Sequence, residues 1–286
     1  MKKRNQWTSV LLVVFFVLLA VLTLFPLYAI LLASFKPTTE VFRKGLNVSW
    51  DLPMMSFDNY VYLFTGNEGY FQWFGNSLLV TVIQTVATLF VCAFVGYGFA
   101  MYSFKFKNLM FTCVLLVMMI PLEIIILPLF QLYKGIFDLT SGNIQLLDTY
   151  WGLILPFVAQ AMPIFFFRQY MSGLPHDFVD AGRVDGCSEY GIFFRIMMPL
   201  AVPSFAAMGI LVGMNSWNGF LWPLIVLRSQ SKLTLPLGLA SLLSPYGNNY
   251  AVLIAGSVMA IIPILILFIS FQRYFIEGMT AGGVKG

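Results

Sequence analysis

The sequence predicts an all-α integral membrane protein with six transmembrane helices. Of its 286 residues, 59% are hydrophobic and only 10% are charged, whereas a soluble domain carries about 25% charged residues. The mean hydropathy is +0.85. Long segments contain no Asp, Glu, Lys or Arg; these are residues 5–35, 69–104, 149–167, 196–227 and 233–272.

Each uncharged segment has room for one crossing, because about 20 mostly apolar residues span a bilayer core of about 30 Å. A further apolar segment contains a single acid, Glu123. Polar and turn-forming residues restrict the last span to the end of its segment. The expected spans cover about residues 8–34, 74–101, 109–132, 150–170, 201–227 and 251–274, in one polytopic transmembrane domain over residues 1–286.

The first span follows the basic sequence MKKR, as the apolar core of a signal peptide would. Such a core is only about 7–15 residues long, and the uncharged segment here is about twice that length. We therefore expect a retained signal-anchor helix.

Basic residues set the expected orientation, because cytoplasmic loops carry an excess of Lys and Arg. With six spans both termini lie on one side, which holds ten basic residues against six on the other. The ten are Lys2, Lys3, Arg4, Lys105, Lys107, Arg168, Arg183, Arg195, Arg273 and Lys285. We expect cytoplasmic termini, and we attribute the pI of about 8.9 to this topology and not to nucleic-acid binding.

Residues that common catalytic and metal sites need are scarce. The three cysteines form no CxxC pair, and His176 is the only histidine. These counts argue against a metal cage or a histidine-based triad. The sequence also lacks a GxxxxGK[ST] phosphate loop. We expect a non-catalytic chain with no cofactor of its own.

The largest loop on the expected cytoplasmic side, residues 171–200, concentrates charge: three acids and two arginines fall within residues 180–195. Its pattern predicts two short helices. Pro175 suits the first turn of one helix, Gly186 supplies a left-handed turn that ends it, and Ser188 caps the next. Composition leaves two interpretations open, a loop lying in the lipid interface and a docking element for a cytoplasmic partner.

Motifs in this loop resemble the coupling loop of ABC importer permeases. "DAGRVDG", from Asp180 to Gly186, followed by "RIMMPL", is similar to that family's Glu-Ala-Ala-x-x-x-Gly motif with its trailing apolar helix and proline. Asp180 stands in place of Glu, and Gly182 in place of the second Ala, which loosens the helix by about 1 kcal/mol. Other segments, "SFKP", "MIPLEIIILPLF", "TYWGLILP", "WNGFLWPL" and "GMTAGGVKG", resemble the carbohydrate-uptake branch, so the resemblance covers essentially the whole chain.

The resemblance implies a permease subunit of an ATP-driven sugar importer, spanning the cell membrane several times. In that family the permease pairs with a second, different permease. Two ATPase subunits, which hold the ATP and Mg, lie beneath, and an extracellular sugar-binding protein docks above. The implied ATPase-coupling residues are Asp180, Ala181, Gly182, Asp185, Gly186, Phe193 and Pro199.

Two further segments have alternative interpretations. The tail "IEGMTAGGVKG" has the composition of a frayed terminus, whereas the matching tail in the family inserts between the ATPase subunits; its candidate contacts are Glu277, Gly278, Gly282 and Gly283. The outer loop 229–250 is either a plain connector or, as in the family, a probe of the docked binding protein. Its candidate residues are Ser244, Pro245, Tyr246, Asn248 and Asn249.

Polar groups within the spans are candidates for the substrate pathway. Asn215 and Asn218 are three residues apart and share a helix face near Trp217, and Gln84 lies in the second span. Amides bind sugar hydroxyls, and indole rings stack on apolar sugar faces. The alternative is that these side chains only hold helices together.

A narrower resemblance bears on the substrate. "MSFDNY", "DGCSEYGIFFRIMMPL", "NSWNGFLWPLIVLRS" and "LLSPYGNNY" resemble the permeases of arabino-oligosaccharide importers, which implies arabinan-derived sugars. Maltodextrins, other oligosaccharides and glycerol phosphate remain alternatives. A secondary transporter is the rival class; it would use intramembrane acids or broken helices in repeated halves, and only Glu123 qualifies.

Overall fold

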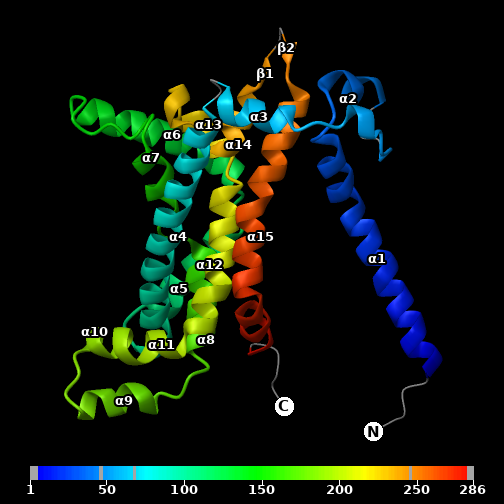
Figure 1. Cartoon of the computed structure of the whole chain (residues 1–286). Coiled ribbons are helices and arrows are strands. Elements are labelled where there is room, and N and C mark those ends of the chain that lie inside the picture. The colour runs from blue at the N-terminus through cyan, green and yellow to red at the C-terminus, as the bar shows by residue number, and fades with distance from the viewer. Residues whose placement is uncertain (1–5, 45–47, 67–68, 245–246, 282–286) are drawn as a thin grey trace. The chain divides into compact units, whose positions relative to one another are not determined.

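The computed structural model describes residues 6–44, 48–66, 69–244 and 247–281, and within them it is helical apart from one short hairpin (Figure 1). The elements in chain order are α1 (Gln6–Ala33), α2 (Thr38–Lys44), η1 (Leu52–Met54), α3 (Asp58–Thr65), α4 (Tyr70–Met101), α5 (Lys107–Met118), α6 (Leu122–Leu139), α7 (Tyr150–Ile154), η2 (Leu155–Phe157), α8 (Ala161–Met171), α9 (Asp177–Val184), α10 (Glu189–Ile192), η3 (Phe193–Met197), α11 (Met198–Leu200), α12 (Val202–Trp217), α13 (Leu221–Val226), η4 (Gln230–Lys232), α14 (Leu235–Ser241), β1 (Leu243–Ser244), β2 (Gly247–Asn248) and α15 (Tyr250–Ala281).

Three helices are long and apolar enough to cross a membrane unbroken, at Trp7–Ala33, Tyr70–Met101 and Tyr250–Arg273. Three more crossings are possible if bent helix pairs count as single spans. Those pairs are α5 with α6, bent by 103°, α7–η2 with α8, bent by 44°, and α10–α11 with α12, bent by 80°. The predicted all-α membrane class is confirmed, with three to six candidate spans.

Three expected spans are interrupted, among them the span at about 150–170, which breaks between Phe157 and Ala161. The span expected at about 109–132 breaks between Met118 and Leu122, where Pro121 disfavours a helical conformation of the residue before it. The span expected at about 201–227 stops at Trp217 and resumes as α13 after three residues that include Gly219. Hydropathy measures how long an apolar segment is, but it does not show where the helix within that segment is interrupted.

The chain forms two compact units, Met1–Phe71 with Gly238–Ile262, and Gln72–Leu237 with Pro263–Gly286. In the first unit, α14 packs closely on α15 at Gly256, where an added Cβ would lie 2.4 Å from Leu239 Cδ2. Tyr70 Oη donates to the Gly256 carbonyl oxygen at 3.3 Å. Glycine therefore permits this contact, since a larger residue would require the Leu239 side chain to move.

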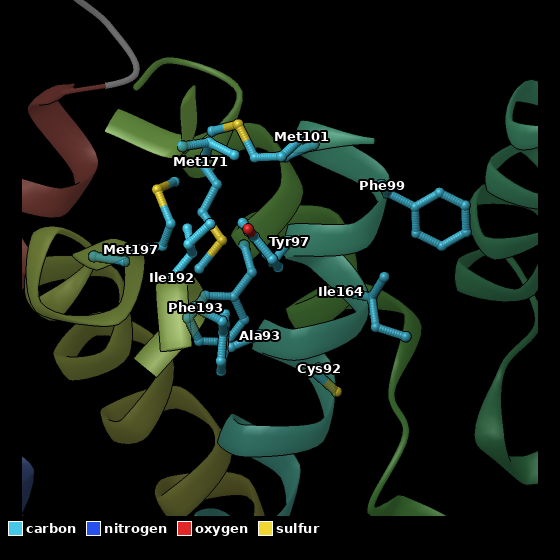
Figure 2. Close-up of a cluster of buried hydrophobic side chains, with 14 of the residues drawn as sticks. Cys92, Ala93, Tyr97, Phe99, Met101, Ile164, Met171, Ile192, Phe193 and Met197 are labelled. Carbon is cyan, nitrogen blue, oxygen red and sulfur yellow. The ribbon is translucent and has the colours of Figure 1, made fainter. Parts of the chain in front are cut away.

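The second unit holds a cluster of buried hydrophobic side chains (Figure 2). Ala93 and Tyr97 of α4 and Met171 of α8 surround Phe193 and Met197 from the π-helical segment η3. Figure 1 shows α9, α10 and α11 at one end of this unit, with α6, α7 and α13 at the other. The charged loop is therefore built into the core of the unit, and its position is set by packing against α4 and α8.

Candidate functional site

The charged loop forms the two expected short helices, α9 and α10. Gly186 joins them in the left-handed conformation, with φ of +76°. Ser188 caps α10, because its Oγ accepts a hydrogen bond from the Gly191 backbone N–H at 3.1 Å. Pro175 differs from its expected place, since α9 begins two residues later, at Asp177.

Buried residues fix α9 against the segment that follows it. Val179 and Gly182 are the buried residues of α9. A Cβ added to Gly182 would lie 2.9 Å from Ile196 Cδ1 and 3.0 Å from Ile192 Cγ1. The glycine therefore lets α9 lie close against α10 and η3, a packing role that the motif comparison did not indicate.

A polar network ties the two helices to the end of α4. Arg183 Nε donates to Glu189 Oε1 at 2.9 Å, and Arg183 Nη1 donates to Asp180 Oδ1 at 3.3 Å. The Tyr102 hydroxyl donates to Glu189 Oε2. The Arg183 guanidinium, followed by the Tyr102 hydroxyl, lowers the pKa of the Glu189 carboxyl, so this group is ionised at neutral pH.

Aromatic contacts reinforce the attachment to α4. The rings of Tyr190 and Phe94 are parallel, with centroids 5.9 Å apart, and Phe193 meets Phe94 edge to face at 5.2 Å. Ring contacts therefore hold α10 and η3 against α4, and the Tyr102–Glu189 hydrogen bond joins α10 to the residue just past its end.

The coupling candidates divide into an open set and a buried set. Asp180, Ala181, Asp185, Gly186 and Pro199 are exposed, whereas Gly182 and Phe193 are buried. Two exposed apolar side chains join the open set, Val184 at 87% and Tyr190 at 67% exposure. Val184 and Tyr190 were not among the coupling residues that the family motif implies.

A cavity of about 370 Å³ lies in the second unit, between α4, α6, η2 and the broken pair α12–α13. Polar and aromatic side chains line it, among them Gln84, Gln160, Asn215, Ser216, Thr234, Phe157, Phe220 and Trp222. A mixed polar and aromatic lining is typical of small-molecule sites.

Hydrogen-bonding groups in the cavity are not fully used by the chain. Gln84 Oε1 accepts from Ser216 Oγ at 3.2 Å, and among the described residues its amide nitrogen has no acceptor. Thr234 is 5% exposed, and its Oγ1 has no partner in the described part of the chain. Buried polar groups normally pair. Thr234 Oγ1 is enclosed, so the Gln84 amide nitrogen is the group that a bound hydroxylated molecule can reach.

The four pathway candidates are not brought together. Gln84 and Asn215 line the cavity, whereas Trp217 and Asn218 do not. Trp217 is buried and packs edge to face on Phe74 at 5.4 Å, and the Asn218 N–H ends α12 by donating to the Met214 carbonyl oxygen at 3.0 Å.

The sequence comparison missed Gln160, Ser216 and Thr234, which line the cavity; Ser216 lies in α12, Gln160 directly before α8 and Thr234 directly before α14.

Asp148 anchors the connection that leads into α7. Its Oδ1 accepts from the N–H groups of Arg228 and Ser229 at 2.9 and 3.0 Å, and its Oδ2 accepts from Ser229 Oγ at 2.6 Å and Lys232 Nζ at 3.2 Å. Burial raises the pKa of this carboxyl, but the four hydrogen bonds together lower it well below its usual range. Beyond this anchor, the Gly152 carbonyl accepts from Tyr133 Oη and Trp222 Nε1, so the α7 and α13 walls of the cavity are held together.

The outer loop and the tail are described in part. Ser244 and Asn248 lie in the β1–β2 hairpin, while Pro245 and Tyr246 fall outside the described residues. Asn249 Oδ1 accepts from Thr38 Oγ1 at 3.2 Å. In the tail, Glu277 and Gly278 belong to α15, and Gly282 and Gly283 fall outside the described residues.

Membrane-length helices, broken spans around a polar cavity and a structured charged loop together define a transport permease. Residues 91–280 match the binding-protein-dependent transport system inner membrane components, and the chain belongs to this family. This confirms the resemblance seen in the sequence motifs. The chain is therefore an inner-membrane, non-catalytic permease subunit that works with a substrate-binding protein.

The comparisons also identify individual relatives. The chain is 55% identical over 275 residues to the arabinooligosaccharides transport system permease protein AraQ of Bacillus subtilis (strain 168), covering 96% of this chain and 95% of that protein. It is 52% identical to the AraQ of Halalkalibacterium halodurans, covering 100% and 99%. Its fold matches a chain in the crystal structure of a bacterial ABC transporter involved in the import of the acidic polysaccharide alginate, with a TM-score of 0.78, 22% identity, and coverage of 96% and 99%.

Proposed function

We propose that this permease carries arabinose-containing oligosaccharides into the cell in an ATP-driven importer. The observation that carries the proposal is the identity of 55% and 52%, over nearly the whole chain, to two permeases named for arabinooligosaccharide transport. The cavity supports it, because the amide nitrogen of Gln84, which has no acceptor among the described residues, suits a polyhydroxylated ligand.

In the proposed assembly, the chain pairs with a second, different permease and two ATPase subunits, with both termini in the cytoplasm. The exposed residues of α9 and α10 dock on an ATPase. Their attachment to α4 supports a direct mechanical route: Gln84 and Phe94 lie ten residues apart on one unbroken helix, about 15 Å along its axis. Movement of the loop then shifts a wall of the cavity.

This route has an energetic requirement. To shift the permease between two conformations from a 1:99 to a 99:1 ratio, the ATPases must bind one conformation more tightly than the other by about 5.5 kcal/mol. ATP-driven closure of the ATPases supplies that difference, and the loop transmits it only if it stays rigidly joined to α4. The ring contacts and the Glu189 hydrogen bonds provide that rigidity.

Two further contacts belong to the same proposal. The hairpin and Asn249 form the surface that meets the extracellular binding protein, supported by the bond that fixes Asn249 to Thr38. The tail from Glu277 onward contacts the ATPase subunits, supported by the helical backbone that continues to Ala281.

Reconstituted vesicles test the proposal. Vesicles that contain this chain, its partner permease, the ATPases and the binding protein are expected to accumulate labelled arabino-oligosaccharide when ATP is enclosed. Accumulation without ATPase subunits would instead indicate a secondary transporter. Preferential accumulation of maltodextrin would reassign the substrate and leave the importer class intact.

A further inference from the structure

Two cations at one end of the second unit have no carboxylate partner. Arg168 lies in the last turn of α8, and Lys107 is the first residue of α5. Arg168 packs on the ring of Phe111, one turn along α5 from Lys107, so the two cations lie on neighbouring turns. Among the described residues, neither side chain forms an ion pair. Two neighbouring positive charges without an acid create a potential that attracts anions.

The geometry of Arg168 leaves its hydrogen-bond donors free. Its Cζ lies 3.6 Å from the centroid of the Phe111 ring, which is itself buried. Stacking occupies one face of the guanidinium, whereas its five N–H donors point outward in its plane. Arg168 Nε is buried and has no acceptor within the described chain. Because Nε is enclosed, the two Nη groups are the donors that an oxygen from outside the chain can reach, and they too have no acceptor among the described residues.

Lys107 adds a second set of donors beside this group. Its Nζ donates one hydrogen bond, to the Tyr102 carbonyl oxygen at 2.7 Å. An ammonium group carries three donors, so two remain for a ligand. An anion with several oxygens, such as a phosphate, matches a guanidinium fork and an ammonium together.

The surroundings of the pair are apolar and exposed. Phe106, directly before Lys107, is 62% exposed and has a φ of +66°, and Lys105 Nζ lies 5.2 Å from the centroid of its ring. Leu109 and Met110, in the first turn of α5, are also exposed. Cations beside exposed apolar side chains at the end of a membrane helix are typical of a bilayer interface.

We propose that Arg168 and Lys107 bind the phosphate of an anionic phospholipid, whose acyl chains lie against the exposed apolar residues at the start of α5. Soluble phosphate esters share the same headgroup chemistry, but they would make no use of the apolar rim. The bound lipid joins α5 to α8. Because α8 meets α4 at Gly96, where an added Cβ would lie 2.7 Å from Phe167 Cβ, the lipid also braces the helix that holds the charged loop.

Native mass spectrometry of the full chain, purified in detergent and titrated with phosphatidylglycerol or phosphatidylcholine, tests the site. We expect phosphatidylglycerol to bind in preference to phosphatidylcholine. Each cation near an anionic lipid contributes about fivefold in affinity, so the double variant Arg168→Gln, Lys107→Gln should bind about 30-fold more weakly. Lys134→Gln, an exposed position on α6, is the matched control and should bind as the wild type does.

A charge-preserving variant separates binding from folding: Arg168→Lys should retain most of the phosphatidylglycerol binding. Equal binding of the two lipids, or unchanged binding by the double variant, would overturn the site. If inorganic phosphate displaced phosphatidylglycerol, the site would bind soluble phosphate groups, and the proposal of a lipid ligand would be wrong. Sugar transport is not the readout, so failure here leaves the proposed function untouched.

Discussion

Arg183 and Glu189 face each other across the turn at Gly186, with Nε and Oε1 2.9 Å apart, and Tyr102 from beyond α4 donates to the same carboxylate. Surface ion pairs contribute little to stability on their own. This pair is instead positioned to hold α9, α10 and α4 in one arrangement, so we expect its loss to affect coupling more than folding.

The charge swap tests this role. Arg183→Glu should reduce ATP-driven sugar uptake several-fold while membrane insertion stays normal, and adding Glu189→Arg should restore part of the uptake. Restoration occurs because the swapped pair can still bridge α9 and α10. Equal uptake by wild type and Arg183→Glu, at matched expression, would rule out this role for the pair.

The pH dependence follows from the lowered pKa of Glu189. A depressed carboxyl pKa means that the ion pair contributes fully above the ordinary glutamate value of about 4.3 and is lost as the pH falls through the lowered value. Coupling should therefore be insensitive to protonation of Glu189 near neutral pH. Uptake by Glu189→Gln and wild type should differ in rate but show the same pH profile there; a wild-type-specific loss on mild acidification would contradict the assignment.

Gly186 should be intolerant of substitution because of its backbone alone. Its φ is +76°, and nothing lies within 4 Å of an added Cβ. Gly186→Pro removes the left-handed turn, because proline fixes φ near −65°, and should block transport without preventing insertion. Gly98→Ala is the control, since Gly98 lies within α4 and an added Cβ meets nothing within 4 Å. Normal transport by Gly186→Pro would show that the turn is dispensable.

Two glycines of α4 provide a matched pair for the packing of α4 on α8. At Gly96 an added Cβ would lie 2.7 Å from Phe167 Cβ and 2.9 Å from the Arg168 backbone nitrogen, whereas at Gly98 it would meet nothing within 4 Å. Gly96→Ala should destabilise the purified chain by about 1–3 kcal/mol, and Gly98→Ala should not. Thermal unfolding in detergent compares them, and equal midpoints would refute the close approach of the two helices.

The Asp148 anchor makes a separate prediction about the cavity walls. Asp148→Asn removes a charge that four hydrogen bonds stabilise and should cost about 1–3 kcal/mol. Asp138→Asn, an exposed acid on α6, is the control. Thermal unfolding and the apparent KM of uptake measure the effect; an Asp148→Asn protein with wild-type stability would mean that the anchor is not structural.

Much of this architecture was predictable from sequence, and the exceptions have physical causes. The two short helices and the turn at Gly186 follow from local signals, namely a left-handed glycine and a serine cap. The breaks at Pro121 and after Trp217 were not predicted, because hydropathy averages over them. The role of Gly182 depends on Ile192 and Ile196 lying opposite it, and the cavity residues Gln160 and Thr234 lie in connections far apart in the sequence. Contacts between residues far apart in the chain produce no regular spacing that could be recognised in the sequence.

Uptake by cells tests the central claim most directly. Cells that lack this chain would be given labelled arabino-oligosaccharide, before and after the gene for the wild-type chain or for Gln84→Ala is restored. We predict no uptake without the chain, full uptake with the wild type, and reduced uptake with Gln84→Ala, because that variant removes an amide from the cavity. Undiminished uptake of arabino-oligosaccharide by cells without the chain would contradict the claim.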